Sequence, residues 1–146
     1  MTTKSEVAVA TFSKGYNCAQ SVFYAFCDDL GIDKTTGLKL ACGFGGGMGR
    51  KEEVCGAVTG AIFAIGAKYG KSEAADQKAL DTTYRKTREL MDGFSRKHGT
   101  YICRSLLGGC ELTTDEGQKQ FKQKDLRTSV CVACVKSAVE ILEAIL

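Results

Sequence analysis

The sequence predicts an all-α fold, a compact bundle of about five to six helices with one glycine-rich loop. Apolar residues recur at helical spacing along most of the chain, and no stretch alternates apolar and polar residues long enough to indicate a strand. Proline, the strongest helix breaker, is absent. Because 146 residues are the size of one ordinary domain, we expect a single cysteine-rich α-helical domain over residues 1–146.

In the first half of the chain, glycine and asparagine mark where helices begin and end. Gly15 ends a short first helix, and Asn17 is a good N-cap for a second helix, which Gly31 ends. The run from 43 to 49 is rich in glycine and therefore predicts a turn or loop. The helices expected in this half cover residues 6–14, 18–30, 33–42 and 50–69.

In the second half, a long polar-faced helix is followed by shorter segments. The long helix is expected over residues 72–98, and the only histidine, His98, is interpreted as its C-terminal cap rather than a ligand. Residues 104–107 predict a helical turn, Thr114 caps a polar helix, and the last helix covers residues 130–146. The expected buried stripe of the long helix is Leu80, Tyr84, Leu90, Met91 and Phe94.

Composition argues against several classes of function. The net charge is only +3, and the lysines and arginines are scattered among acidic residues, which does not favour nucleic-acid binding. The most apolar run, residues 54–67, is shorter than the ~20 residues that cross a bilayer, so no membrane span is expected. The first residues lack the order of a signal peptide, and we expect a cytoplasmic protein. Since structural disulfides are rare in the cytoplasm, grouped cysteines there indicate metal or redox chemistry.

Several of the eight cysteines stand where a helix is expected to begin. They are Cys18, Cys55, Cys131 and Cys134. The partial positive charge and free N–H groups of a helix N-terminus lower the pKa of a thiol, and Arg50, Lys51 and Arg127 lie close in sequence to add positive charge. The thiolate is the nucleophile of disulfide exchange and the form that binds soft metals. Thiol or metal–thiolate chemistry is the leading interpretation, and buried, inert cysteines are the alternative.

The glycine-rich run leads into Cys55 and an apolar helix. Gly56 and Gly60 share a face of that helix, which lets a second helix approach closely. We expect the loop at 43–49 to position Cys55 and to shelter a site. A phosphate loop is not indicated, because the glycines are followed by arginine, lysine and glutamate instead of the Walker lysine and hydroxyl residue.

A CxxC motif, CVAC at residues 131–134, opens the last expected helix. Its two cysteines share a helix face, and the spacing serves both dithiol exchange and metal binding. No βαβ pattern surrounds it, which excludes a thioredoxin-like fold. A zinc site would need a second pair of cysteines at close spacing, and the spacing of Cys103 and Cys110 suits this poorly. Cys27 is expected in the core.

Three motifs, taken together, resemble those of one protein family. They are GYNCAQ at residues 15–20, GGGMG at 45–49 and CGAVTG at 55–60. The family is named C_GCAxxG_C_C after its cysteine pattern, and its description as redox-active is inferred from those cysteines. The resemblance covers nearly the whole chain and implies a catalytic set of Cys18, Cys55, Cys103 and Cys131. The same four cysteines, joined by Cys134 through its helical spacing from Cys131, are the candidate metal ligands.

A similar domain occurs in split-Soret cytochromes, where it is associated with an iron–sulfur centre and with haem. This chain has no haem-attachment motif, so the resemblance carries over only an iron–sulfur expectation. Thiolates from separate segments could surround an iron–sulfur cluster or a tetrahedral zinc ion. A metal-free exchange between dithiol and disulfide is the alternative to these two metal sites.

The sequence thus predicts a redox-active protein that uses clustered cysteines for thiol–disulfide or metal–thiolate electron-transfer chemistry. The alternative is a small helical binding or scaffold protein whose cysteines hold a structural metal or only pack. Candidate partners are a redox partner protein and a second copy of the chain in a homodimer. Neither a substrate nor an enzymatic reaction is indicated by the residues.

Overall fold

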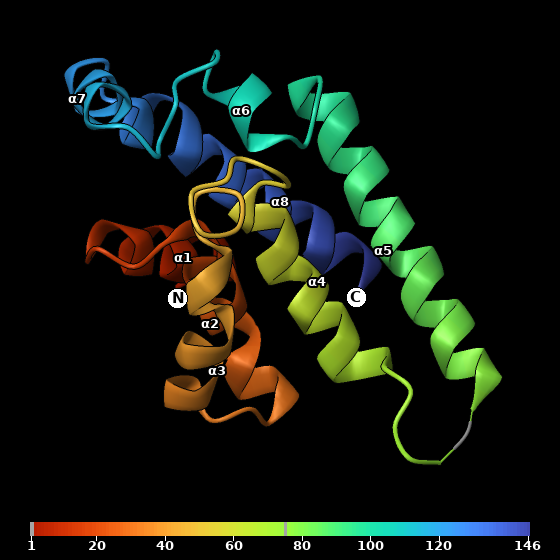
Figure 1. Cartoon of the computed structure of the whole chain (residues 1–146). Coiled ribbons are helices and arrows are strands. Elements are labelled where there is room, and N and C mark those ends of the chain that lie inside the picture. The colour runs from red at the N-terminus through yellow and green to blue at the C-terminus, as the bar shows by residue number, and fades with distance from the viewer. Residues whose placement is uncertain (1, 75) are drawn as a thin grey trace.

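Helices make up the framework of the molecule (Figure 1). The computed structural model describes residues 2–74 and 76–146, and within them it has eight α-helices, no strand and one isolated β-bridge. The all-α prediction is confirmed, but a count of about five to six helices is too low because short helices flank the loops. The helices are α1 (Lys4–Ser13), α2 (Cys18–Leu30), α3 (Lys34–Ala41), α4 (Gly56–Tyr69), α5 (Gln77–His98), α6 (Cys103–Leu106), α7 (Asp115–Gln123) and α8 (Val132–Ile145).

α2 shows how local sequence sets the ends of a helix. The Asn17 side chain accepts a hydrogen bond from the Gln20 N–H at 2.9 Å, and the Asn17 N–H donates to the Gln20 side chain at 3.0 Å. This reciprocal capping box fixes the start of the helix. Gly31 ends it in the left-handed conformation, with a φ of 68°. The predicted bounds are confirmed, and Cys18 is the first residue of α2.

The prediction of one helix over residues 50–69 is wrong for residues 50–55. Arg50 and Glu52 have φ angles of 65° and 62°, in the left-handed region that no right-handed helix can use. The Glu52 N–H donates to the Gly46 carbonyl at 3.0 Å, so the chain folds back on the glycine-rich loop before α4 begins. Tertiary hydrogen bonds override the local helical pattern here.

The prediction that Cys131 and Cys134 begin a helix is also wrong. The chain is already helical at Leu126, and Arg127–Cys131 form a π-helical turn that leads directly into α8. The partial charge of a helix start fades within the first turn, so it does not act on these two cysteines. A π-helical turn is rare and occurs frequently at functional sites.

α5, the longest helix with 22 residues, begins later than the expected residue 72. Residue 75, which falls in that expected segment, lies outside the described chain. Leu90 and Phe94 are buried as expected, but Tyr84 is 57% exposed and does not belong to the buried stripe. Each helix of the described residues is too short or too polar to cross a membrane.

His98, at the end of α5, joins that helix to α8. Its Nε2 atom forms a hydrogen bond of 2.8 Å with the Ser137 hydroxyl, and its ring stacks on Phe94 with centroids 4.6 Å apart. Gly99, with a φ of 83°, ends the helix. His98 therefore does not act as the helix cap but links α5 to α8.

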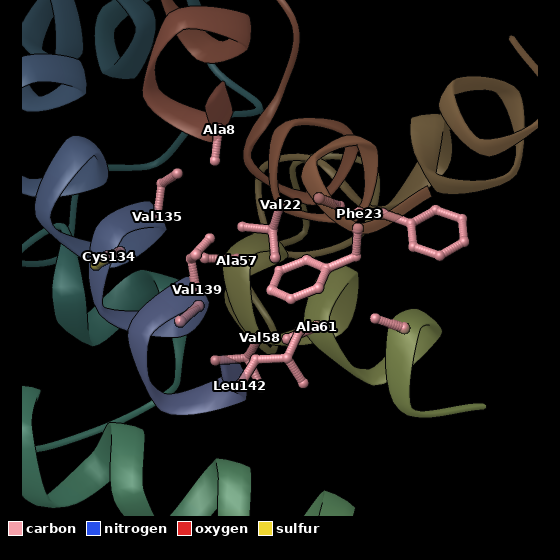
Figure 2. Close-up of a cluster of buried hydrophobic side chains, with 14 of the residues drawn as sticks. Ala8, Val22, Phe23, Ala57, Val58, Ala61, Cys134, Val135, Val139 and Leu142 are labelled. Carbon is pink, nitrogen blue, oxygen red and sulfur yellow. The ribbon is translucent and has the colours of Figure 1, made fainter. Parts of the chain in front are cut away.

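The main hydrophobic core surrounds α4. A Cβ on Gly60 would lie 2.5 Å from the Ala19 carbonyl oxygen, so only glycine permits this approach of α2. The predicted close approach of a second helix at Gly60 is confirmed. On the other side, Figure 2 shows Val139 and Leu142 of α8 directed at Val58 of α4, and all three side chains are fully buried.

A second, smaller cluster of buried residues lies at one end of the bundle. It is built by α6, the loop that follows and α7, which lie at the top of Figure 1 near the start of α8. Phe121 and Leu126 pack against it, and Val130 and Cys131 pack against both this cluster and the main core, which joins the two. Its buried members are Cys103, Leu107, Cys110 and Leu112.

Candidate functional site

A cavity of about 400 Å³ lies between the main core and the smaller cluster. The glycine-rich loop forms one wall, and apolar side chains such as Leu112 and Phe121 form another. All five cysteines expected at a site line this one space, together with one more. The lining cysteines are Cys18, Cys42, Cys55, Cys103, Cys131 and Cys134.

Two extended segments hold Cys55 beside Cys103. The Cys55 N–H donates to the Tyr101 carbonyl at 2.8 Å, and the Cys103 N–H donates to the Glu53 carbonyl at 2.6 Å. These two hydrogen bonds flank the isolated antiparallel β-bridge at Val54. Residues that are distant in sequence are thereby aligned, and nothing in the sequence around either cysteine predicts this pairing.

The glycine-rich loop winds in a left-handed sense. Five consecutive residues, 46–50, have φ angles between 58° and 71°, a region that L side chains avoid. At Gly47 a Cβ would lie 2.7 Å from the Glu52 Cα and 2.8 Å from the Cys103 Cβ. The loop therefore packs its backbone directly against Cys103. Backbone strain of this kind, about 1–2 kcal/mol for each non-glycine residue, is concentrated at functional sites.

Cys18 and Cys131 form the more exposed of two thiol pairs. The two thiols lie close enough to shift each other's pKa, and both side chains are half-buried where they line the cavity. The Cys18 thiol lowers the pKa of Cys131, and the nearby Arg127 guanidinium lowers it further, against the opposing effects of burial and of Cys55. The Cys131 thiol, together with burial, raises the pKa of Cys18, so the lowering expected from its helix start is not found. Of this pair, Cys131 is the thiol that loses its proton more easily.

Cys55 and Cys134 form a second pair, and both side chains are buried. The nearby Cys134 thiol lowers the pKa of Cys55. The N–H groups of Ala57 and Val58 at the start of α4 lower it further, although neither makes a full capping bond. The nearby Cys55 thiol, together with burial, raises the pKa of Cys134 well above its ordinary value. The expected effect of a helix start on Cys55 is present here.

Cys103 is the fifth sulfur of the expected set and is held as a thiol. Burial raises its pKa to about 12, assisted by the charges of Cys55, Cys131 and Glu52. It begins the short helix α6, but burial outweighs any effect of that helix start. Cys103 thus differs from Cys55 and Cys131, whose pKa values are lowered.

Glu52 is a buried carboxylate that sequence reasoning misses. Its side chain is 1% exposed, and its Oε1 atom accepts the Leu112 N–H at 3.0 Å and lies 3.8 Å from the Arg104 guanidinium. Its Oε2 atom has no hydrogen-bond partner among the described residues. Glu52 stands in the charged run RKEE at 50–53, which is typical of an exposed segment, and its partner Leu112 is far along the chain. No local signal identifies it.

Arg127 brings a fixed positive charge close to Cys131. Its guanidinium donates to the Tyr16 carbonyl at 3.0 Å and to the Phe12 carbonyl, and it stacks on the Phe12 ring at 3.7 Å from the centroid. The π-helical turn is therefore tied to the end of α1. Arg127 lies one turn before Cys131, and the positive charge expected from its place in the sequence lowers the pKa of Cys131.

The three other cysteines have different surroundings. Cys27 is buried in the core as expected, and its thiol donates to the Phe23 carbonyl at 3.3 Å. The buried Cys110 thiol donates to the Gly117 carbonyl at 3.1 Å, inside the smaller cluster. Cys42 is exposed at the rim of the cavity. Cys27 and Cys110 therefore have structural roles.

Comparison with known proteins agrees with the cysteine pattern. A family model described as "Putative redox-active protein (C_GCAxxG_C_C)" matches residues 16–145. The chain belongs to this family. The match includes all six cysteines that line the cavity. No curated protein and no solved structure matches the chain, so the similarity to split-Soret cytochromes stays a prediction.

The cavity of this C_GCAxxG_C_C protein offers soft ligands for a metal. All eight cysteines have free thiols, and five of them lie close enough to shift one another's pKa values. Thiolates suit zinc and iron–sulfur clusters. Among residues 2–74 and 76–146, however, no three His, Cys, Asp or Glu side chains converge as the ligands of one metal ion. The donor chemistry fits a soft metal, and metal binding stays a prediction for Cys18, Cys55, Cys103, Cys131 and Cys134.

Cys131 is expected to react with iodoacetamide at a lower pH than Cys18 and Cys103 in the reduced, metal-free protein. Its lowered pKa means that the reactive thiolate is present below the ordinary thiol value of about 8.5. Cys103 should stay protonated and unreactive up to about pH 10, because its pKa is raised to about 12. Peptide mass spectrometry over a pH series measures each cysteine.

The control is the same protein unfolded in urea, in which all eight cysteines should titrate together. If Cys131 follows the same pH curve in the folded and unfolded protein, its thiolate is not stabilised by the fold.

Proposed function

We propose that the cavity is a thiol–disulfide redox site in which Cys131 is the attacking thiolate and Cys18 is the resolving thiol. The observation that carries this proposal is the placement of Cys18 and Cys131 on the wall of one cavity, close enough that each shifts the pKa of the other. The Cys18 thiol and the Arg127 guanidinium lower the pKa of Cys131, whereas the pKa of Cys18 is raised. Disulfide exchange needs this division between a nucleophile and a second thiol that follows it.

The electron acceptor in this reaction is a disulfide, RS–SR. The Cys131 thiolate attacks one of its sulfurs, the S–S bond breaks, and a mixed disulfide forms as RS⁻ leaves. The Cys18 sulfur then attacks Sγ of Cys131, so that a Cys18–Cys131 bond forms and the second RS⁻ leaves. The pair loses two electrons, and the acceptor is reduced to two thiols. The Cys18 proton passes to one leaving thiolate, and solvent protonates the other.

Cys55 and Cys134 supply a second dithiol behind the first. The Cys55 thiolate can attack the Cys18–Cys131 disulfide at Cys131, and Cys134 then resolves the intermediate to a Cys55–Cys134 bond. The first pair returns to its reduced form, and no electrons are gained or lost overall. Two features support this transfer. The pKa of Cys55 is lowered, and Cys55 lies close enough to Cys131 to shift its pKa.

A metal–thiolate centre is the second candidate, because five interacting sulfurs line one cavity. Cys18, Cys55, Cys103 and Cys131, with Cys134, would hold an iron–sulfur cluster or a zinc ion. A cluster supplies one-electron transfer to a redox partner protein, whereas zinc supplies a structural link. Anaerobic purification followed by metal analysis and a visible spectrum separates the cases. A cluster absorbs visible light, zinc is measurable but colourless, and a dithiol protein shows neither.

Redox equilibration of the metal-free protein tests the dithiol proposal. The protein is held in glutathione buffers of stepped potential, and its remaining thiols are then trapped with an alkylating agent. We expect a reversible two-electron transition, which changes the oxidised-to-reduced ratio tenfold for about 30 mV. If the thiols stay fully reduced at every potential of the series, or if oxidation cannot be reversed, the thiol–disulfide proposal is wrong.

A further inference from the structure

The cavity carries positive charge and no carboxylate on its walls. Arg50 and Arg127 line it, and none of its lining residues in the described chain is acidic. Arg127 is already engaged with two backbone carbonyls and the Phe12 ring. Arg50 is exposed, and the ion pairs found among the described residues do not include it. Arg50 is therefore a guanidinium at the mouth of the cavity whose charge is not compensated.

The dimensions of the cavity suit a small molecule. Its volume of about 400 Å³ lies within the range of roughly 300–1,000 Å³ that is usual for small-ligand sites. Part of the lining is apolar and can cover the hydrocarbon part of a ligand. Its apolar members are Leu106, Leu107, Leu112, Phe121 and Val130.

We propose that the disulfide that exchanges with Cys131 is a small anionic one, whose carboxylate is received by Arg50 at the mouth of the cavity. This inference rests on the thiol–disulfide function proposed above. A guanidinium pairs with a carboxylate through two parallel N–H···O bonds, which fixes orientation as well as charge. The ligand's carboxylate then lies at the mouth while its S–S bond reaches inward to Cys131.

Electrostatics separates this ligand class from neutral and cationic disulfides. The Arg127 guanidinium is engaged with the Phe12 and Tyr16 carbonyls and with the Phe12 ring, so its donors are already used within the protein. The charge of Arg50 is left to act on whatever enters. It attracts an anionic disulfide, has little effect on a neutral one and repels a cationic one.

The test compares three disulfides of similar shape, 3,3′-dithiodipropionate, bis(2-hydroxyethyl) disulfide and cystamine, which carry anionic, neutral and cationic ends. Each rate with the reduced, metal-free protein is divided by the rate of the same disulfide with a simple model thiol, which removes differences between leaving groups. We expect the anionic compound to be favoured over the cationic one by about tenfold at an ionic strength of about 0.15 M. The preference should shrink in high salt.

Arg50→Glu should reduce this anionic-to-cationic ratio by at least about fivefold. The matched control is Lys51→Glu, the same charge change at an exposed neighbour that does not line the cavity, with an expected effect below about twofold. Because the ratio compares two ligands of one protein, a change in the pKa of Cys131 cancels.

If all three disulfides oxidise the protein at equal normalised rates, or if both variants change the ratio equally, the anionic-ligand inference is wrong while the thiol–disulfide function stands. If none of the three oxidises the thiol pair, the proposed function itself fails.

Discussion

Cys131→Ser is expected to slow exchange with small disulfides by at least about 100-fold. Serine is close to cysteine in size, but its hydroxyl is not ionised near neutral pH, so the nucleophile is lost while the packing is kept. Cys18→Ser should behave differently. Cys131 can still attack in that variant, but its resolving thiol is missing, so a mixed disulfide should accumulate above the wild-type level. Intact-protein mass spectrometry at fixed times measures both outcomes.

The matched control for these two variants is Cys42→Ser. Cys42 lines the same cavity but is exposed at its rim, so we expect a rate within about twofold of the wild type. Should Cys131→Ser react as fast as the wild type, or Cys42→Ser lose as much activity, then Cys131 is not the attacking thiolate.

Gly60→Ala is expected to lower the free energy of unfolding by about 1–3 kcal/mol. The added Cβ would lie 2.5 Å from the Ala19 carbonyl oxygen and 2.9 Å from the Ala19 Cα, so α2 must move away from α4. Cys18 directly precedes Ala19, and Cys55 is the N-cap of α4. The substitution should therefore also move Cys18 relative to Cys55 and alter thiol reactivity.

Gly66→Ala is the control on the same helix. Within the described chain, no heavy atom lies within 4 Å of a Cβ added there, apart from the chain neighbours and the backbone of the same helix. Because glycine in a helix interior costs about 0.5–1 kcal/mol relative to alanine, we expect this variant to be more stable than the wild type. Urea unfolding followed by far-UV circular dichroism measures both free energies. A similar change in both variants would show that α2 and α4 are not closely packed at Gly60.

Much of the helical framework follows from local sequence. Asn17 with Gln20, and Gly31 with its positive φ, fix the ends of α2 by interactions that span only a few residues. Gly60 also reveals its role locally, because glycines four apart on an apolar helix are typical of close helix packing. Such features depend on neighbours in the chain, which is why sequence reasoning finds them.

The parts that sequence reasoning misses depend on distant partners. Arg50 and Glu52 look helical in sequence, but hydrogen bonds to the glycine-rich loop hold them in the left-handed region. Glu52 is buried, and the partner that its carboxylate binds there, the Leu112 N–H, is far along the chain. Likewise, Cys131 looks like the start of a helix, although the chain is already helical from Leu126.

The sequence predicts a group of cysteines but not how they pair. The family resemblance, with the CxxC spacing, names five of the six cysteines that the structure places around the cavity. Which thiol pairs with which depends on the approach of α2 to the π-helical turn and on the β-bridge at Val54. The contrast between Cys131, with a lowered pKa, and Cys103, with a pKa raised to about 12, likewise arises from burial and charges that only the fold brings together.

Disulfide mapping of the oxidised protein decides most directly whether Cys18 and Cys131 are a redox pair. The reduced, metal-free protein is oxidised with one equivalent of a small disulfide, trapped by alkylation and digested without reduction. We expect the first cross-linked peptides to join Cys18 to Cys131, while Cys103 carries the alkyl label after unfolding. If Cys18 and Cys131 are both alkylated from the earliest time point, while the first disulfide joins cysteines other than Cys55 and Cys134, the thiol pair at the cavity is not the redox site.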